Sequence, residues 1–579
     1  MGKYSFIYWA CGALLWMGCS SDNGALAESR TKVLQMETDK ACYDPGEVVT
    51  FTVNETVNGQ VFVRYRYLDK VLAEAPLTGK EWSWMPPATD YKGYMVDVYE
   101  KQGEEERTLG SIAVDVSSDW KKFPRYGFLS HYSSVTPEQL GRNVATLNRY
   151  HINGVQYQDW HCKHHQPMAG TISEPAALWT DIANRKVEKN IVDRYIAETH
   201  KYGMKSIFYN LCFGALKDAE QDGVLPGWFI YKDRECKEQD RHPLPANWKS
   251  DIYLVDPGNA EWQQYLAGEN AKVYHTFGFD GYQIDQLGSR DEVYDSRGNK
   301  VDLPSGYLSF IHAMKQAHPD KRLVMNAVSE FGQGKIAQGE VDFFYNEVWG
   351  DAPKYTDLVR IMENNRSLND KLATVFAAYM NYNVADREGY FNTPGILLTD
   401  AVMFAFGASH LELGEHMLGK EYFPNNNLKM KADLEAALIH YYDFLVAYQN
   451  LLRDGGDFNK VELTCDNGKM SVAAWPPQYN NVSVVGKKVD NRQLVHLINL
   501  SQAVNQDWRD VDGNQPEPQR IEQAALTLKV PTPVEKIWMA SPDINGGLPQ
   551  TIEFEQNPSE VSFVLPELKY WNMIVVEYK

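Results

Sequence analysis

The chain has 579 residues, too many for a single hydrophobic core, and its length predicts several domains. Its formal net charge of −20 argues against nucleic acids and anionic membrane surfaces as partners, and it suits a neutral substrate. Aromatic residues are abundant, with 15 Trp and 34 Tyr, but such side chains serve large cores as well as sugar binding. Composition therefore excludes classes of partner and does not by itself identify a substrate.

The first residues of the chain are typical of an export signal. A positive charge precedes an apolar run of residues 6–17, and Gly18-Cys19 is followed by small polar residues. The run is too short for a membrane-spanning helix, and the junction resembles a bacterial lipoprotein signal. We expect residues 1–19 to be a signal peptide whose Cys19 carries lipid, and residues 20–31 to be a tether. The protein would then be exported and lipid-anchored to the bacterial outer membrane, at the cell surface or in the periplasm, with simple secretion as the alternative.

Residues 32–118 alternate between apolar and polar positions in short segments. The segments 48–53, 60–65 and 94–99 have this period of two, and Asp44-Pro45-Gly46 marks a turn. Several such strands in a short range predict an N-terminal immunoglobulin-like β-sandwich.

From residue 119 to residue 456 the pattern changes to strand, loop and helix. Helical stretches such as 190–202 and 259–276 separate short apolar runs. The eight runs are 126–130, 154–158, 206–209, 281–285, 323–326, 341–347, 374–380 and 410–413. Eight such repeats predict a central (β/α)₈ TIM barrel with long loops. A doubly wound sheet is the alternative, but we see no Gly-rich phosphate loop to support it.

Residues 457–579 return to the β pattern. The expected strands are 461–464, 470–474, 482–485, 494–499, 525–530, 536–539 and 562–565. They predict a C-terminal antiparallel β-sandwich. The loop 505–520 between two of these strands is polar and contains proline.

Two carboxylates end apolar runs of the predicted barrel. Asp285 closes the run 281–285 and Glu347 closes the run 341–347, so both are expected at the C-terminal ends of strands, where barrel active sites lie. Cleavage of a glycosidic bond needs such a pair, one ionised and one protonated. A helix cap or a strand-end ion pair is the alternative for either residue alone. Asp280 and Asp342, which precede the same runs, are expected at the opposite, stabilising end.

A second candidate group follows the predicted strand 154–158. Its proposed binding residues are Asp159, Trp160, His164 and His165. A carboxylate beside aromatic rings suits sugar hydroxyls and ring stacking, although Trp160 could instead be a core residue. Three His and one Cys within 161–165 raise the alternative of a metal site. Consecutive His residues cannot easily face one metal from a regular element, so no metal and no cofactor are predicted.

Other candidates for substrate contacts lie at the ends of the later runs. They are Gln283, Asn326, Trp349, Tyr382 and Glu412. Among these, Glu412 is expected to hydrogen-bond a sugar hydroxyl at the terminal subsite.

Four stretches together resemble glycoside hydrolase family 66. They are Asp-Gly-Tyr-Gln-Ile-Asp-Gln-Leu-Gly (280–288), Tyr-Asn-Glu-Val-Trp (345–349), Gln-Asp-Trp-His-x-x-His-His-x-Pro (158–167) and Glu-Tyr-Phe-Pro-Asn (421–425). The resemblance extends over nearly the whole mature chain. It implies that Asp285 matches the family nucleophile, that Glu347 matches the acid/base, and that Asp159 and Trp160 match a stretch lining the site.

That family contains endo-dextranases and cycloisomaltooligosaccharide glucanotransferases. The resemblance therefore implies a retaining double displacement on α-1,6-glucan, with dextran and isomaltooligosaccharides as partners. Cyclising members carry an extra sugar-binding module inserted in the barrel region, and no insertion of that size lies between residues 125 and 454. This favours a hydrolytic endo-dextranase, and the export signal resembles those of glycan-degrading Bacteroidetes. A glucanotransferase and a non-catalytic glycan-binding lipoprotein are the alternatives.

Overall fold

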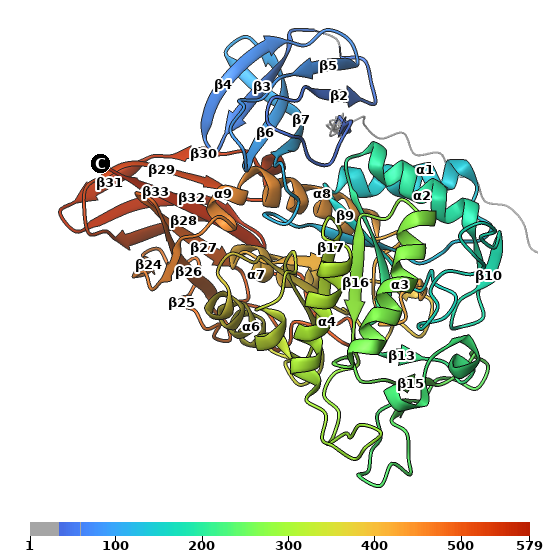
Figure 1. The fold of residues 1–579 in the computed structure, drawn as a ribbon. Helices are drawn as coiled ribbons and strands as arrows, with labels where there is room; N and C mark the ends of the chain where they lie inside the picture. The colour runs from blue at the N-terminus through green and yellow to red at the C-terminus, as the bar shows by residue number, and fades with distance from the viewer. Residues whose placement is uncertain (1–33, 58) are drawn as a thin grey trace, which may run out of the picture. The chain divides into compact units, whose positions relative to one another are not determined.

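The computed structural model describes residues 34–57 and 59–579 (Figure 1). The predicted signal peptide with Cys19 and the tether 20–31 lie outside these residues, so export and lipid anchoring stay predictions. No helix within the described residues has the length and apolar character needed to cross a membrane.

An eight-stranded parallel sheet forms the centre of the described chain. Its strands are β8 (Tyr126–Leu129), β9 (Gly154–Tyr157), β12 (Lys205–Leu211), β16 (Gly281–Asp285), β17 (Arg322–Val328), β18 (Phe344–Val348), β19 (Thr374–Ala378) and β21 (Ser409–Leu411). They are hydrogen-bonded in the order β21-β19-β18-β17-β16-β12-β9-β8. The two end strands also meet, because the N–H of Phe128 donates to the carbonyl of Leu413 at 3.1 Å. The predicted eight-stranded parallel barrel is confirmed, and the doubly wound alternative is wrong.

Helices follow most of the barrel strands (Figure 1). They are α1 (Pro137–Arg149), α2 (Lys189–Lys201), α3 (Ala260–Thr276), α4 (Leu303–Ala317), α5 (Gln333–Ile336), α6 (Tyr355–Leu368), α7 (Thr393–Ala405), α8 (Ala432–Ala447) and α9 (Gln449–Leu452). Local sequence sets several of their starts. Thr136 caps α1 by accepting a hydrogen bond from the N–H of Gln139, and Pro137 occupies the first turn, where its missing N–H costs nothing.

The barrel loops contain short elements of their own. These are β10 (Leu178–Thr180), β11 (Lys186–Glu188), β13 (Gly214–Ala215), β14 (Arg241–His242), β15 (Ile252–Leu254), β20 (Gly389–Tyr390), β22 (Leu428–Lys429) and the 3₁₀ turns η1 (Ala219–Asp222) and η2 (Pro226–Trp228). The loop between β12 and α3 is long and carries a three-stranded sheet of β13, β15 and β14.

The N-terminal ends of the barrel strands are closed by packing and by structural carboxylates. Asp280 accepts a hydrogen bond at 2.7 Å from the N–H of Ser206, near the start of β12. Asp342 accepts one at 2.7 Å from the indole Nε1 of Trp120. That indole packs so tightly on Gly154 that a Cβ there would lie 2.1 Å from a ring carbon. The stabilising positions expected for Asp280 and Asp342 are confirmed, and the opposite end of the barrel is left for a site.

Antiparallel sheets precede and follow the barrel. The N-terminal strands are β1 (Met36–Thr38), β2 (Val49–Val53), β3 (Val61–Tyr67), β4 (Lys70–Pro76), β5 (Glu81–Trp84), β6 (Lys92–Gln102) and β7 (Glu105–Val116). They form the sheets β1-β2-β5 and β4-β3-β6-β7, whose apolar faces share one buried cluster. The immunoglobulin-like type of this region and the domain limits 32–118, 119–456 and 457–579 stay predictions.

The C-terminal residues form two further sheets around a second buried cluster. Their elements are β23 (Asp457–Asn459), β24 (Leu463–Cys465), β25 (Val472–Ala474), β26 (Val482–Val489), β27 (Arg492–Ile498), β28 (Ile521–Lys529), β29 (Val534–Ala540), η3 (Asn545–Gly547), β30 (Gln550–Ile552), β31 (Phe554–Asn557), β32 (Glu560–Leu568) and β33 (Trp571–Tyr578). Sequence reasoning did not predict β33, a buried strand between β27 and β29.

Buried polar contacts connect the N-terminal sheets to the barrel. Arg125 and Asp115 form an ion pair at 2.7 Å with both side chains fully buried. On α8, Asp443 accepts a hydrogen bond from the N–H of Ala113 at 2.9 Å and pairs with Arg149 and His151 at 2.8 and 2.7 Å. Burial alone would raise the pKa of Asp443, but Arg149 and His151 outweigh it and hold the pKa well below its usual range. These contacts place charged groups of the N-terminal sheets and of the barrel in one buried interface.

Candidate active site

A cavity of about 620 Å³ opens at the C-terminal ends of the barrel strands. Barrel strands supply its floor and long loops supply its walls. Its lining includes Gln156, Gln158, Asp159, His164, Tyr209, His242, Trp248, Gln283, Asp285, Asn326, Tyr345, Glu347, Trp349, Tyr379, Glu421, Tyr422 and Phe423. Carboxylates, amides and aromatic rings alternate in this lining, which is the chemistry that neutral polyhydroxylated ligands require.

The two strand-end carboxylates meet in this cavity. Asp285 is the last residue of β16, and Glu347 lies at the end of β18, two strands away across β17. Asn326 on β17 bridges them: its Nδ2 donates to Oδ1 of Asp285 at 2.8 Å and to Oε2 of Glu347 at 2.8 Å. The two oxygens therefore lie no further apart than twice that distance. The expectation that these side chains converge at one end of the barrel is confirmed.

Tyrosine hydroxyls hold the other oxygen of each carboxylate. Tyr209, on β12, donates to Oδ2 of Asp285 at 2.7 Å. Tyr379, directly after β19, donates to Oε1 of Glu347 at 2.8 Å. All four carboxylate oxygens thus have a donor. Sequence reasoning missed both tyrosines, although each stands at the end of a predicted strand.

Burial raises the pKa values of both carboxyl groups. For Asp285, three hydrogen bonds oppose the effect of burial, from Tyr209, Asn326 and the backbone N–H of Gln286. Glu347 faces the negative charge of Asp285 in addition to its burial, and its pKa rises to about 7. The arrangement favours a charged Asp285 beside a protonated Glu347 near neutral pH, which are the two states that glycosidic cleavage needs.

A third carboxylate, Asp159, lines the same cavity. Its backbone φ is 50°, in the left-handed region that non-glycine residues rarely adopt, and such strain concentrates at functional positions. Burial raises the pKa of Asp159 to about 7; the guanidinium of Arg185 opposes this rise, and the charges of Asp181 and Asp285 add to it. The structure thus places Asp159 in the same cavity as Asp285 and Glu347.

Four other predicted binding residues also line the cavity: His164, Gln283, Asn326 and Trp349. The ring of His164 is held by Asn210, whose Nδ2 donates to the His164 carbonyl at 2.8 Å and whose Oδ1 lies 2.8 Å from Nδ1. Since the amide oxygen can only accept, Nδ1 carries the proton. Burial lowers the pKa of His164 to about 4, so the ring is neutral. Its Nε2 is then available as a hydrogen-bond acceptor for a hydroxyl.

Trp160 does not reach the cavity, and the expectation that it stacks on a sugar is corrected. The ring is fully buried, its Nε1 donates to the carbonyl of Tyr209 at 3.2 Å, and it packs against Phe277 and Phe279. The core alternative is right for this residue. Because its Nε1 donates to the backbone carbonyl of Tyr209, Trp160 helps to hold Tyr209 in place beside the cavity.

His165 and Glu412 are also corrected, because both point into other buried networks. His165 pairs with Asp222 at 2.9 Å through Nε2 and accepts from the N–H of Leu216 through Nδ1. Glu412 is fully buried, accepts from the Tyr442 hydroxyl at 3.0 Å and lies outside the cavity. The consecutive histidines 164 and 165 face different partners, and of residues 161–165 His165 belongs to a possible ligand group, with Asp218 and Asp222.

Tyr382 stands behind the cavity wall instead of lining it. Its hydroxyl donates to Glu421 at 2.9 Å, and its ring lies 6.1 Å from that of Trp349. The Arg509 guanidinium lies 4.7 Å from the Tyr382 ring and 5.8 Å from the Trp349 ring. Tyr382 therefore supports the cavity wall, and the expectation that it contacts substrate directly is corrected.

Arg509 belongs to the C-terminal loop for which sequence reasoning predicted only polarity. Trp508 in this loop is fully buried and its Nε1 donates to the carbonyl of Ala352 at 2.6 Å. The next residues reach the end of β19, where the N–H of Asn381 donates to the carbonyl of Arg509 at 2.9 Å. The C-terminal part of the chain thus contributes directly to the support of the cavity wall.

Comparison with known proteins finds similarity over most of the chain. A model of glycosyl hydrolase family 66 matches residues 38–575. A cycloisomaltooligosaccharide glucanotransferase from Niallia circulans is 28% identical over 711 residues, covering 93% of this chain and 72% of the relative. A dextranase from Streptococcus salivarius is 23% identical over 563 residues, covering 84% and 68%.

The fold itself has a solved counterpart. A crystal structure of a Paenibacillus sp. cycloisomaltooligosaccharide glucanotransferase complexed with cycloisomaltoheptaose matches with a TM-score of 0.86. The match has 24% identity and covers 94% of this chain and 99% of that one. At this identity the likeness establishes a shared fold.

Proposed function

Because this chain belongs to glycosyl hydrolase family 66, we propose that it is an endo-dextranase that hydrolyses internal α-1,6-glucosidic bonds and releases isomaltooligosaccharides. One observation carries the proposal: Asp285 and Glu347 share the Nδ2 donor of Asn326 at 2.8 Å each, inside a cavity large enough for sugar rings. A non-catalytic glycan-binding protein would have no need of this pair.

The spacing of the two carboxylates supports retention of anomeric configuration. Retaining enzymes hold their carboxyl groups about 5–5.5 Å apart, and inverting enzymes hold them about 6.5–9.5 Å apart to admit a water. The shared donor limits the facing oxygens to no more than twice 2.8 Å. That limit lies below the inverting range, which supports a retaining mechanism.

The proposed reaction proceeds in two displacements. Asp285, charged and fixed by Tyr209, attacks the anomeric carbon, while protonated Glu347 donates its proton to the glycosidic oxygen that leaves. The covalent glucosyl–Asp285 ester then reacts with water, and Glu347, now charged, accepts the proton from that water. Because each carboxylate oxygen already has a donor, both groups keep their orientation throughout.

Four further residues suit substrate binding. Asp159 and His164 offer hydrogen-bonding groups beside Asp285. At the rim, Trp248 and Tyr422 lie with their ring centroids 5.6 Å apart and both line the cavity. Aromatic rings at this position provide stacking surfaces for the apolar faces of glucose units on either side of the cleaved bond.

Sequence length supports hydrolysis over cyclisation. The alignment with the Niallia circulans glucanotransferase spans 711 residues, more than the 579 of this chain, so that relative contains residues with no counterpart here. The alignment with the dextranase spans 563 residues and covers 84% of this chain, so its excess is smaller. The missing residues agree with the absence of the additional module expected in cyclising members.

Export and anchoring remain part of the proposal. The sequence of residues 1–19 supports cleavage before Cys19 and lipidation of that residue. Mass spectrometry of the membrane fraction would detect a diacylglyceryl group on Cys19, and a Cys19→Ala variant would be released from membranes. An unmodified Cys19 in membrane-purified protein would contradict anchoring and leave the enzymatic proposal intact.

Incubation with dextran tests the catalytic proposal. We expect new reducing ends, a rapid fall in mean polymer size and linear isomaltooligosaccharides, with the first product in the α configuration by NMR. Cyclic products would instead identify a glucanotransferase. Binding of dextran without new reducing ends would contradict both enzymatic functions and identify a glycan-binding protein.

A further inference from the structure

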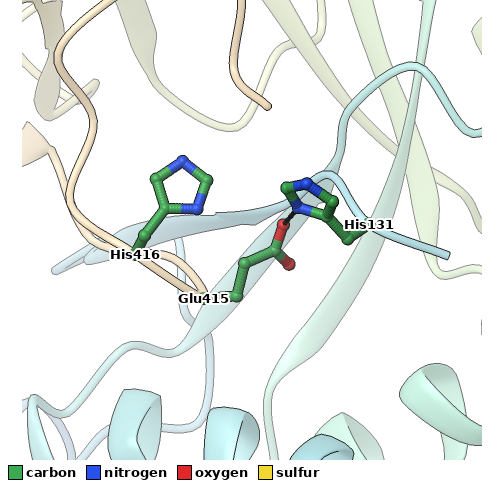
Figure 2. Close-up of side chains that lie close together, drawn as sticks. All are labelled: His131, Glu415 and His416. Carbon is green, nitrogen blue, oxygen red and sulfur yellow. Dashed lines mark hydrogen bonds and ion pairs between the residues drawn. The ribbon is translucent and has the colours of Figure 1, made fainter. Parts of the chain in front are cut away.

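We propose that His131, Glu415 and His416 bind a divalent transition-metal ion of the zinc class where the first and last barrel strands meet (Figure 2). One ligand atom from each of these residues lies within 4.8 Å of the other two. An ion bound about 2.0–2.2 Å from each atom requires small shifts of the side chains, in which His131 Nδ1 and Glu415 Oε1 move apart from their present 2.6 Å. The site is separate from the Asp285–Glu347 pair.

The three residues come from two loops that meet at the barrel seam. His131 follows β8 by two residues, and Glu415 and His416 follow β21 by four and five residues. The seam itself is held by the parallel pairing of Phe128 with Gly414. Figure 2 shows one ring nitrogen of His416 on the side that faces Glu415 and His131. An ion here would link the ends of the two strands.

His416 has the protonation pattern of a metal ligand. Its Nε2 lies 2.8 Å from the carbonyl oxygen of Phe423, which can only accept, so Nε2 carries the proton. Its Nδ1 then presents a lone pair, and this buried atom has no hydrogen-bond partner among the described residues. Metal-binding histidines commonly donate their second ring N–H to a carbonyl in this way. A buried acceptor without a donor is costly, and an ion would satisfy it.

Glu415 is oriented toward the same point by donors outside the ligand set. Its Oε1 accepts from the N–H of Ser130 at 2.9 Å and from the Ser130 hydroxyl at 2.7 Å. The same oxygen lies 2.6 Å from Nδ1 of His131. Metal binding would displace the proton that joins His131 to Glu415, while Ser130 continues to hold the carboxylate. The His131 side chain is 42% exposed, which gives the ion a path of entry and room for water ligands.

Two other His-carboxylate clusters in the described residues are less suited to an ion, because one already holds a cation and the other has no access from solvent. In the first, Lys163 Nζ already lies 2.7 and 2.5 Å from Asp218 and Asp222, so the site beside His165 holds a cation of its own. In the second, Asp400, His410 and Glu412 are all buried to 1% exposure or less, which leaves no path for an ion. Among the three clusters found in residues 34–57 and 59–579, only His131, Glu415 and His416 combine an unpartnered ring nitrogen with access from solvent.

An ion bound by His131, Glu415 and His416 would affect the cavity by holding part of its lining in place. His416 donates to the carbonyl of Phe423, and Phe423 lines the cavity with its neighbours Glu421 and Tyr422. Fixing His416 would therefore restrict the segment that carries Tyr422, one of the two rim aromatic rings. His131, Glu415 and His416 are positioning residues in this view and have no role in bond cleavage.

Isothermal titration of the chelator-treated full chain with Zn²⁺ tests the proposal without reference to activity. We expect one ion per chain, and at least tenfold weaker binding in His131→Gln and His416→Gln. His165→Gln and His200→Gln serve as matched controls, since His165 belongs to the lysine-filled cluster and His200 pairs with Asp280 alone at 2.8 Å. Both controls should bind Zn²⁺ with a dissociation constant within about twofold of that of the unchanged protein.

A second measurement keeps the result independent of folding defects. Co²⁺ bound by two His and one Glu should give visible d–d absorption in the unchanged protein and in both controls. Circular dichroism would verify that each variant is folded. No uptake of either ion by the unchanged protein, or loss of uptake in His165→Gln with retention in His131→Gln, would overturn the proposal. Dextran cleavage without any metal uptake would overturn it and leave the proposed function standing.

Discussion

The hydroxyl of Tyr209 lies 2.7 Å from Oδ2 of Asp285, and it stabilises the charged form of that carboxylate in a buried site. Burial opposes ionisation of Asp285 and of Glu347 alike, so the donors around each group decide which one carries the charge. Each carboxylate accepts from one tyrosine hydroxyl and from Asn326. Asp285 also accepts from the backbone N–H of Gln286, whereas Glu347 faces the charge of Asp285, and these two differences favour the proposed roles.

Tyr209→Phe should therefore raise the pKa of Asp285 and shift the acidic limb of the kcat/KM profile upward by about one pH unit. A hydrogen bond to a charged group contributes about 1.5–3 kcal/mol, and 1.36 kcal/mol corresponds to one pH unit. Tyr157→Phe is the control, because its hydroxyl contacts Thr199 and Ser206 away from the cavity. An unmoved limb in Tyr209→Phe, or an equal shift in the control, would contradict the assignment.

Asp285→Asn should lower kcat at least about a thousandfold, because the amide cannot form the glucosyl ester. Thermal unfolding should change little, since the amide keeps the shape of the carboxylate. Asp280→Asn, at the other end of the same strand, should show the reverse pattern: kcat within about threefold and stability lower by about 1–3 kcal/mol through its bond to Ser206. Comparable kcat losses in both variants would argue against the placement of the site.

Glu347→Gln should change stability in a pH-dependent manner. The pKa of Glu347 in the folded chain, about 7, lies above its ordinary value of 4.5, so protonation favours folding. This contribution is complete below pH 4.5 and is lost as pH rises through 7. Urea unfolding should show similar stability of variant and parent at pH 5, and a variant more stable by about 1–3 kcal/mol at pH 9. Glu340→Gln, at an exposed position, is the control. A stability difference between Glu347→Gln and the parent that does not vary with pH would contradict the raised pKa of Glu347.

Arg509→Met should raise KM for dextran about two- to tenfold with little change in kcat. The guanidinium lies near the rings of Tyr382 and Trp349, and such contacts contribute about 0.5–2 kcal/mol. Arg509 contacts neither Asp285 nor Glu347, so the chemical step should persist. Arg520→Met, which removes an exposed partner of Glu567 in the C-terminal sheets, is the control. Unaltered kinetics in Arg509→Met would show that the loop does not influence the wall.

The barrel and its two carboxylates could be predicted because both follow from local rules. Parallel strands buried on both faces give short apolar runs, and the last residue of such a run lies at the functional end of the barrel. Asp285 and Glu347 satisfy this rule without knowledge of their partners. Asp280 and Asp342 were separated from them by the same rule, since they precede the runs.

The predictions were wrong where residues distant in the sequence decide the direction in which a side chain points. Trp160 immediately follows Asp159, but the chain turns there at a positive φ, and the indole enters the core formed with Phe277 and Phe279. Glu412 lies one residue beyond β21, and Tyr442 on α8 draws it into a buried network. Local sequence does not distinguish a carboxylate that faces a cavity from one that faces a helix. Long-range packing makes that choice.

The burial of Trp508 makes the C-terminal β region inseparable from the barrel. A chain shortened at residue 456 would leave the carbonyl of Ala352 without its indole donor and the ring of Trp349 without the guanidinium of Arg509. Exchange of the C-terminal region between relatives would succeed only if the docking loop and its receptor were transferred together. The joint at Ala352 lies four residues after β18, the strand that carries Glu347, so any change in the docking loop acts close to the reacting groups.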